Sequence, residues 1–418
     1  MITLLLSIGL SFSSCPSKSD DQFVLKTSDR LHFGRLWDQI RDLHDEDLLL
    51  STILKRRKEI AAIKEHWRSK VDNFKSGYDA PFYEKIENSI KEGTLAASKE
   101  GFGAAYFLFD QQKNPCFVIK PIDEDILCLN NRKYYASPYN DYRFRVRLDI
   151  PLYRSAQAEA LSYAVAQEIG LSHMTPKTII SIVKSENFFD ISDLLTGMEK
   201  ELFLQEAGYP DKEKLCSIQE YIPNMKELFE LVHDWIDRDL SDEEIQNSIN
   251  QNDFEDVMIL IWTTYDTDAH AGNIHVKADS QNLVYSLQKF DNGLTFPNKN
   301  KHLFNSLSFI PNALHPFSLA AQQKIRDIPI SKIVELMEDY EMQDSIGAFL
   351  ERMEILQLLN ARKEITIYEI DLRLHALELR KGKEIALSDI SIAELEEKLF
   401  EDKQTKKKIN HRGTEGTE

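Results

Sequence analysis

A short polar segment between residues 263 and 276 gathers side chains that can carry out phosphoryl transfer. Asp268, His270 and Asn273 lie in this segment, and Asp291 follows after a second apolar stretch, directly before an Asn-Gly pair. A kinase needs a carboxylate that orients the attacking hydroxyl group, and oxygen ligands for the magnesium ions that neutralise the triphosphate of ATP. We therefore predict that Asp268 orients the hydroxyl group and that Asn273 and Asp291 bind Mg²⁺.

The spacing of these residues supports this assignment, although loops also collect Asp, Asn and His because these residues tolerate turn geometry. Asp268 and Asn273 are five positions apart, as in the catalytic loop of protein kinases. Asp266 is the competing carboxylate, with an offset of seven from Asn273. His270 either stabilises charge on the transferred phosphoryl group or hydrogen-bonds within the loop, and the sequence leaves both roles open.

Regular elements must hold this loop in place. An apolar helix is predicted at 254–262 before the loop, and a strand is predicted at 273–276 after it. Much further upstream, apolar residues at helical spacing predict two or three amphipathic helices within residues 28–98.

A second set of candidate residues lies on two predicted strands, 101–109 and 115–121, joined by a polar turn. Lys120 ends the second strand, where a kinase places the lysine that binds the nucleotide phosphates. The small residues Gly101, Gly103 and Ala104 would let backbone N–H groups approach those phosphates, although a tight hairpin explains them as well.

A strong helix is predicted from residue 155 to 169, closed by Gly170. A glutamate on this helix pairs with the strand lysine in the kinase layout. Glu159 near the helix start is the first candidate, and Glu168 is the competing one.

The order Asp-x-His-x-x-Asn that starts at Asp268 resembles the phosphatidylinositol 3- and 4-kinase family, as do residues 291–297 and 117–121. The resemblance covers about half of the chain. It implies a phosphotransferase with an α+β, two-lobed protein-kinase-like fold, in which a small antiparallel-sheet N-lobe and a mostly helical C-lobe bind ATP and Mg²⁺. It also implies a hinge that meets adenine, formed by Glu220, Tyr221 and Ile222.

Two departures from the eukaryotic enzymes concern the acceptor. Ala269 stands where an arginine follows the catalytic aspartate, and the segment after Asp291 has no clear run of lysines beyond Lys299 and Lys301. A phosphatidylinositol-type lipid is the first acceptor that the resemblance implies. A protein acceptor on the same scaffold and a nucleotide-binding pseudokinase or interaction module are the alternatives.

Two further segments bear on the acceptor. Residues 306–316 occupy the place of a substrate-selecting loop, in which Phe309, Ile310 and Leu314 either pack inside or face a membrane, and we favour packing. A predicted strand at 142–148 aligns three arginines, which can bind a phosphorylated headgroup or form ion pairs at the surface. These are Arg143, Arg145 and Arg147.

Composition sets the remaining limits. With 418 residues, 42% of them hydrophobic, the chain can form a full core, and its net charge of −18 argues against nucleic-acid partners. Four scattered cysteines show no metal-ligand spacing and predict reduced thiols. Residues 1–15 have the shape of a bacterial lipoprotein signal without the usual positive start, so a cytoplasmic protein and an exported or lipid-anchored one, including one delivered to a host cell, both stay open.

The predicted organisation follows from these segments. We expect a signal or lipoprotein segment at 1–27, a helical N-terminal extension at 28–98, the N-lobe with its hinge at 99–223, the C-lobe with both loops at 224–330, C-terminal helices at 331–402 and a disordered tail at 403–418.

Overall fold

The computed structural model describes residues 46–76, 80–98, 103–125, 128, 130–132, 153–278, 284–299, 305–362 and 364–375. The predictions made for residues 1–45, for Gly101, for the three arginines of 142–148 and for residues 376–418 lie outside this part of the chain.

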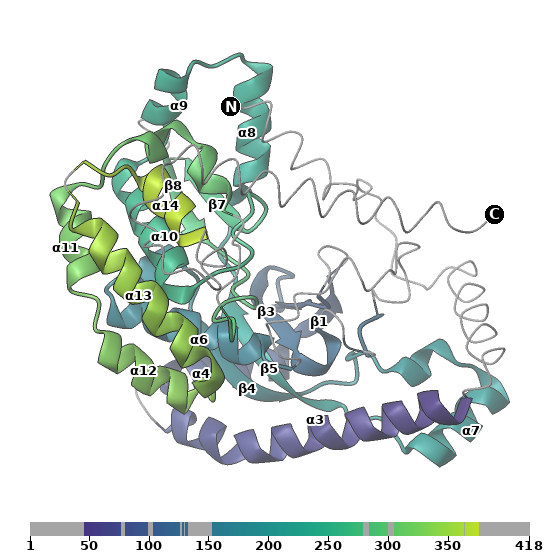
Figure 1. Cartoon of the computed structure of the whole chain (residues 1–418). Helices are drawn as coiled ribbons and strands as arrows, with labels where there is room; N and C mark the ends of the chain where they lie inside the picture. The colour runs from purple at the N-terminus through teal and green to yellow at the C-terminus, as the bar shows by residue number, and fades with distance from the viewer. Residues whose placement is uncertain are drawn as a thin grey trace, which may run out of the picture. The chain divides into compact units, whose positions relative to one another are not determined.

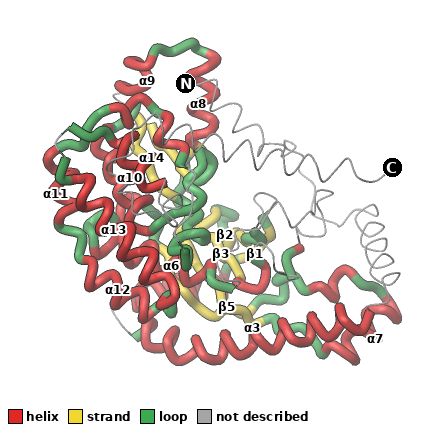
Figure 2. Tube along the Cα trace, in the orientation of Figure 1, coloured by secondary structure: helices red, strands yellow, loops and turns green. Residues whose placement is uncertain are grey.

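The chain divides into two compact units. The first, called here the sheet unit, contains the described residues up to Tyr163 together with Pro176–Pro223. The second, called the helical unit, contains Ala164–Thr175 and the described residues from Asn224 onward. Figures 1 and 2 show the elements of both units.

The sheet unit is built on a five-stranded antiparallel sheet with the order β1-β2-β3-β5-β4. Its strands are β1 (Thr94–Ala97), β2 (Tyr106–Phe109), β3 (Pro115–Pro121), β4 (Thr178–Lys184) and β5 (Glu213–Glu220). The two strands predicted on either side of the polar turn are present as β2 and β3, although β2 is shorter than predicted.

The period of β3 decides where its lysine lies. Phe117 and Ile119 are buried in the core of the sheet unit, together with Phe82 and Ile86 of helix α4 (Ala80–Glu92). Because successive side chains of a strand point to opposite faces, Lys120 projects from the face opposite to these core residues.

Two predicted helices of the N-terminal region are present, α3 (Glu46–Lys75) and α4, but its last residues form the unpredicted edge strand β1. Gly93 makes this possible. A Cβ atom there would lie 2.4 Å from the carbonyl oxygen of Phe109 and 2.6 Å from that of Ser89, so only glycine fits between the end of α4 and strand β2.

Three more helical elements connect the strands of this part of the chain. Helix α6 (Ser155–Glu168) is the predicted helix, and Gly170 follows it with a left-handed φ of +74°. Between β4 and β5 lie the short 3-10 helix η4 (Ile191–Leu194) and helix α7 (Gly197–Ala207).

The helical unit packs seven helices, with a small three-stranded sheet, in its described part. The helices are α8 (Leu228–Asp237), α9 (Asp242–Ser248), α10 (Gln251–Thr264), α11 (Leu319–Arg326), α12 (Ile330–Asp339), α13 (Ile346–Asn360) and α14 (Ile367–His375). The strands are β6 (Lys226–Glu227), β7 (Ile274–Ala278) and β8 (Tyr285–Lys289), in that order and antiparallel.

Helix α10 is the centre of this unit and leads directly to the candidate loop. Every residue from Phe254 to Thr264 is buried, which confirms the predicted apolar helix and extends it. Asn250 caps its start by accepting hydrogen bonds from two backbone N–H groups of the first turn. The helix ends at Tyr265, whose left-handed φ of +52° turns the chain sharply toward the loop.

The predicted α+β fold class is confirmed, since an antiparallel sheet dominates one unit and helices dominate the other. Cys116, Cys128 and Cys216 are free thiols, as predicted. In the described part of the chain, no helix is both long enough and apolar enough to cross a membrane.

Candidate active site

The loop between α10 and β7 is fixed by a buried carboxylate. Asp266 is fully buried, and its Oδ2 lies 2.7 Å from Nζ of Lys289, which is equally buried in strand β8. The other oxygen of Asp266 accepts a hydrogen bond of 2.7 Å from the backbone N–H of Asp268. Asp266 therefore holds the loop in shape and is sequestered from any substrate.

Asp268, in contrast, remains accessible to solvent, with 22% of its side chain exposed. The Nδ2 group of Asn273 donates to the Asp268 backbone oxygen at 2.9 Å and to Asp268 Oδ2 at 3.3 Å. This contact orients both side chains. Since Nδ2 of Asn273 donates to Asp268, its Oδ1 atom is the one that can act as a metal ligand.

His270 lies beside the same carboxylate. Its Nδ1 accepts a hydrogen bond of 3.1 Å from the N–H of Gly272, so the ring proton belongs on Nε2 when the imidazole is neutral. Nε2 is 3.8 Å from Asp268 Oδ2, which is too long for a hydrogen bond. The geometry therefore shows a histidine held within the loop and directed toward Asp268, and it is compatible with both predicted roles.

Asp291 follows the end of strand β8, next to the residues that precede β7. Ile274 pairs with Lys289 in the hairpin, and the N–H of Phe290 donates to the carbonyl oxygen of Asn273 at 2.8 Å. Asp291 itself is exposed and has a left-handed φ of +54°. Aspartate tolerates this backbone region better than most residues do. The hairpin thus brings Asn273 and Asp291 to the same end of β7 and β8.

Lys289 ties the two loops together, and the sequence analysis did not identify it. Besides pairing with Asp266, its Nζ donates to the carbonyl oxygens of Phe290, at 2.5 Å, and Asp291, at 3.3 Å. A signal was present in the sequence. Lys289 stands two positions after the buried Leu287, on the inward face of a strand, where an unpaired lysine would be costly.

His275 packs against the residue that precedes Asp291. Its ring stacks on that of Phe290, with centroids 4.1 Å apart. Burial lowers the pKa of His275 to about 4, so the imidazole is neutral at physiological pH. The backbone beside Asp291 therefore gains no additional positive charge from this histidine.

The predicted lysine-glutamate pair is present in the sheet unit. Nζ of Lys120 lies 2.5 Å from Oε1 of Glu159, whose side chain is 1% exposed. Gln219 of β5 donates to the second oxygen of Glu159 at 3.5 Å. Glu168, the competing residue, is exposed at the end of α6. Glu159 therefore orients Lys120, which keeps part of its own side chain accessible.

The phosphate contact predicted around Gly103 and Ala104 stays a prediction. The N–H of Ala104 itself donates to the carbonyl oxygen of Glu124 at 3.1 Å, so another backbone group would have to make that contact. A Cβ atom at Gly103 would meet only Asp125 Oδ1, at 3.8 Å, so this turn has space for a side chain. Both features follow from tertiary contacts that the local pattern of small residues does not reveal.

The hinge predicted at Glu220, Tyr221 and Ile222 stays a prediction, but two of its backbone donors are already engaged. The N–H groups of Glu220 and Tyr221 donate to the carbonyl oxygens of Lys177, at 2.8 Å, and Cys116, at 3.0 Å. These two donors complete the antiparallel sheet, so they are not available to an adenine ring. Any adenine contact in this segment must use other backbone groups, and Ile222 lies half-buried beside them.

A buried charge cluster braces the glycine-rich turn, and sequence reasoning missed it. Glu124 accepts hydrogen bonds from Tyr106, at 2.6 Å, and from Lys214, at 2.8 Å. Arg132 donates to the carbonyl oxygens of Ser98 and Ala105, at 3.0 and 2.8 Å, on either side of the turn. Burial raises the pKa of Glu124 to about 7.

The packing predicted for residues 306–316 is present in part. It forms two 3-10 helices, η5 (Ser306–Phe309) and η6 (Pro311–Leu314). Ile310 is buried and Phe309 is partly buried, as favoured, but Leu314 is 45% exposed. The N–H of Ser306 donates to the carbonyl oxygen of Ala269 at 2.9 Å, which attaches this segment to the candidate loop.

The donor set of the loops fits Mg²⁺. Asp268, Asn273 and Asp291 offer carboxylate and amide oxygens, the hard ligands that this ion prefers, alongside substrate phosphates. No group of three or more His, Cys, Asp or Glu residues in the described part of the chain is arranged to bind a metal by itself. A site of this kind therefore depends on Asn273 and on oxygens from the nucleotide.

The chain has distant sequence similarity to a kinase. No protein-family model matches this sequence. Over 302 residues, or 68% of this chain, the sequence is 22% identical to phosphatidylinositol 4-kinase gamma 3 of Arabidopsis thaliana. The matched region is 47% of that protein, so the chain spans about half the length of this relative.

Solved structures were compared as well. The Golgi casein kinase aligns with 73% of this chain and 78% of its own, with a TM-score of 0.41 and 13% sequence identity. The Helicobacter pylori proinflammatory kinase CtkA aligns with 68% of this chain and 97% of its own, with a TM-score of 0.36 and 11% identity. The chain thus has sequence similarity to a kinase, and its fold is of the α+β class expected for one.

Proposed function

We propose that this protein is a kinase that transfers the γ-phosphoryl group of ATP to a hydroxyl group, with Mg²⁺ as the metal ion. The observation that carries this proposal is the loop geometry of the helical unit. An accessible Asp268 is hydrogen-bonded to Asn273, and the adjoining hairpin brings Asp291 to the same end of its strands. The similarity to a phosphatidylinositol 4-kinase supports the same chemistry.

Each residue then has a defined task. Asp268 accepts a hydrogen bond from the acceptor hydroxyl group, orients its oxygen for attack on the γ-phosphorus and takes up its proton. Asn273 and Asp291 hold Mg²⁺, which when bound neutralises charge on the triphosphate. Lys120, oriented by Glu159, binds phosphate oxygens as a point charge. His270 stabilises charge close to Asp268.

The acceptor that we propose is a phosphatidylinositol-type lipid. The Asp-x-His-x-x-Asn order from Asp268 supports it, and so does the name of the similar plant kinase. A protein acceptor and a nucleotide-binding module without turnover are the two alternatives, and one experiment separates all three.

The experiment supplies the purified full chain with Mg²⁺, γ-labelled ATP and either phosphatidylinositol vesicles or a protein mixture. Label in the lipid supports the proposal, whereas label in protein alone indicates a protein kinase. ATP binding without transfer to either acceptor indicates the binding module. The Asp291→Asn variant is the blank, because this exposed side chain can be replaced without disturbing the core.

A further inference from the structure

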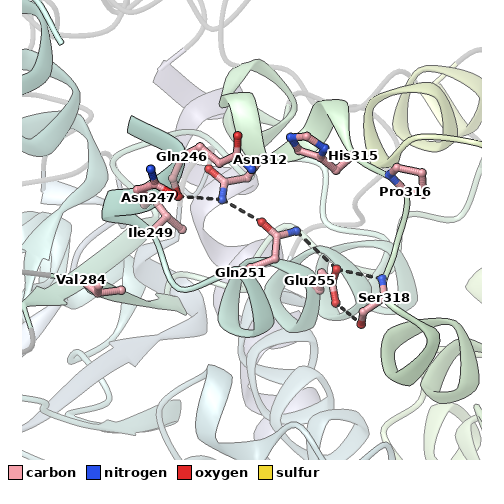
Figure 3. A pocket seen from close by; sticks show the side chains of 10 residues that line it. All are labelled: Gln246, Asn247, Ile249, Gln251, Glu255, Val284, Asn312, His315, Pro316 and Ser318. Atoms are coloured by element: carbon pink, nitrogen blue, oxygen red, sulfur yellow. Dashed lines mark hydrogen bonds between the residues drawn. The ribbon is translucent and has the colours of Figure 1, made fainter. Parts of the chain in front are cut away.

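A hollow of about 410 Å³ opens in the helical unit, and it shares Asn312, His315 and Pro316 with the segment 306–316 described above. Figure 3 shows a row of hydrogen-bonded side chains along it, from Asn312 through Gln251 and Glu255 to Ser318. The row links helix α10 to η6 and to the start of α11. Among the described residues that line the hollow there is no lysine or arginine.

The carboxylate of Glu255 lies at the base of this hollow without a counterion. Its side chain is 3% exposed, and it accepts hydrogen bonds from the N–H and Oγ of Ser318, at 3.0 and 2.5 Å, and from Gln251 at 3.3 Å. The neighbouring Asp256 pairs with Lys324 at 2.6 Å, whereas no cation of the described chain lies within ion-pair distance of Glu255. A buried carboxylate without a cation is costly, so a cationic ligand would stabilise it.

Asn312 provides a second acceptor in the same hollow. Its side chain is fully buried, and its Nδ2 donates to Gln251 Oε1 at 2.8 Å and to the carbonyl oxygen of Gln246 at 3.3 Å. Its Oδ1 is buried and has no hydrogen-bond donor within the described part of the chain. Buried polar atoms are nearly always paired, with protein or with ordered water, so a donor is expected at this oxygen, and an N–H group of a ligand is one group that can supply it.

We propose that this hollow, lined by Glu255 and Asn312, binds an organic cation that carries several N–H donors, a guanidinium or ammonium group. A guanidinium group suits it best, because a planar fork of N–H donors can reach a carboxylate and an amide oxygen together. The exposed imidazole of His315 at the rim offers a ring surface on which that group can stack.

The chemistry excludes other ligand classes. An anion such as a phosphate would meet the Glu255 carboxylate, and no lysine or arginine of the described lining offsets the repulsion. A divalent metal ion would find a single carboxylate, which is fewer ligands than such ions need. The cation belongs either to an arginine or lysine side chain of a polypeptide or to a free polyamine.

This inference does not depend on the proposed kinase activity, and its test measures binding alone. The full chain is titrated with N-acetylarginine amide, with the uncharged isostere N-acetylcitrulline amide and with spermidine, and binding is followed by saturation-transfer NMR and calorimetry. We expect saturable binding of the arginine amide and binding of the citrulline amide that is weaker by at least about tenfold. Binding of spermidine alone would assign the cation to a polyamine.

Three variants locate the binding. Glu255→Gln removes the charge and should weaken binding by at least about tenfold. Asn247→Lys places a cation at the exposed rim and should weaken binding even if Glu255→Gln fails to fold. Glu335→Gln on α12 makes the same charge change outside the hollow and should leave binding unchanged.

Two results would overturn the proposal. One is the absence of saturable binding for both the arginine amide and spermidine at millimolar concentration. The other is binding that neither Glu255→Gln, in a folded protein, nor Asn247→Lys weakens.

Discussion

Each unit uses an ion pair to position its candidate functional groups, but only in the sheet unit is a candidate group itself a member of the pair. In the sheet unit, a buried carboxylate, Glu159, holds the functional cation Lys120 directly. In the helical unit, the buried pair of Asp266 and Lys289 holds only backbone, and the functional carboxylates Asp268 and Asp291 remain outside it.

This difference determines how function and stability are coupled. Removal of Lys120 leaves a buried charge on Glu159, so loss of function and loss of stability should occur together. Removal of Asp268 or Asp291 leaves the buried pair intact, so function should be lost alone. In the helical unit, the groups proposed to carry the chemistry are therefore separate from those that maintain the loop.

Replacement of Asp291 tests this separation most strongly. Asp291→Asn should reduce Mg²⁺-dependent transfer to the level measured without protein, because it removes the carboxylate ligand. Its melting temperature should match the wild type, since asparagine also tolerates a φ of +54°. Asp291→Ala should lose transfer equally and destabilise the protein by about 1 kcal/mol through backbone strain. Wild-type transfer by either folded variant contradicts the assignment.

Asp266→Asn should show the opposite behaviour. The sequence analysis named Asp266 as the carboxylate that competes with Asp268 for the catalytic role. The structure indicates that its replacement acts on stability, because Asn leaves a fully buried Lys289 without its counterion. Urea denaturation should show that the free energy of unfolding falls by about 3–5 kcal/mol. Unchanged stability would mean that the pair does not hold the loop.

Lys120→Met should combine both effects. It should weaken Mg²⁺-ATP binding and reduce the free energy of unfolding by about 1–3 kcal/mol, a value below that of a fully buried pair because Lys120 is partly exposed. Lys85→Met is the matched control, since Lys85 pairs with Glu220 at the surface and should contribute less than about 1 kcal/mol. Equal free energies of unfolding for Lys120→Met and Lys85→Met would mean that the pair of Lys120 and Glu159 does not couple function to stability.

The smallest effect is expected at His275, whose pKa of about 4 lies below the unfolded-state value near 6.5. The unfolded chain therefore binds a proton first as the pH falls. The stability linked to His275 is complete above pH 6.5 and is lost toward pH 4, with about 2 kcal/mol lost between pH 7 and pH 5. The free energy of unfolding of His275→Phe, measured by denaturation, should lack this pH-dependent component. A pH profile identical to that of the wild type would refute the burial of a neutral imidazole.

Periodicity explains why much of the fold could be predicted. The apolar run that became α10 and the alternation that places Lys120 opposite Phe117 are local patterns. The pairing of Lys120 with Glu159 was predicted from the kinase layout and not from periodicity, and it is present. The five-residue spacing of Asp268 and Asn273 was also matched to that layout, and the structure shows the two side chains hydrogen-bonded.

Contacts between distant segments could not be predicted in this way. Strand β1 depends on the close approach of Phe109 to Gly93, and the N–H of Ala104 is taken by the carbonyl oxygen of Glu124. Lys289 was missed because a lysine in a strand is usually exposed, and only the three-dimensional structure shows its pairing with Asp266.

The central claim is that Asp268 orients the acceptor hydroxyl group, and it is tested most directly by Asp268→Asn. Mg²⁺-ATP affinity and the rate of label transfer should be measured on the same preparations of this variant and the wild type. We predict unchanged ATP affinity and melting temperature, with transfer slowed by about 10²–10⁴-fold. A folded Asp268→Asn protein that transfers phosphate at the wild-type rate would contradict the claim.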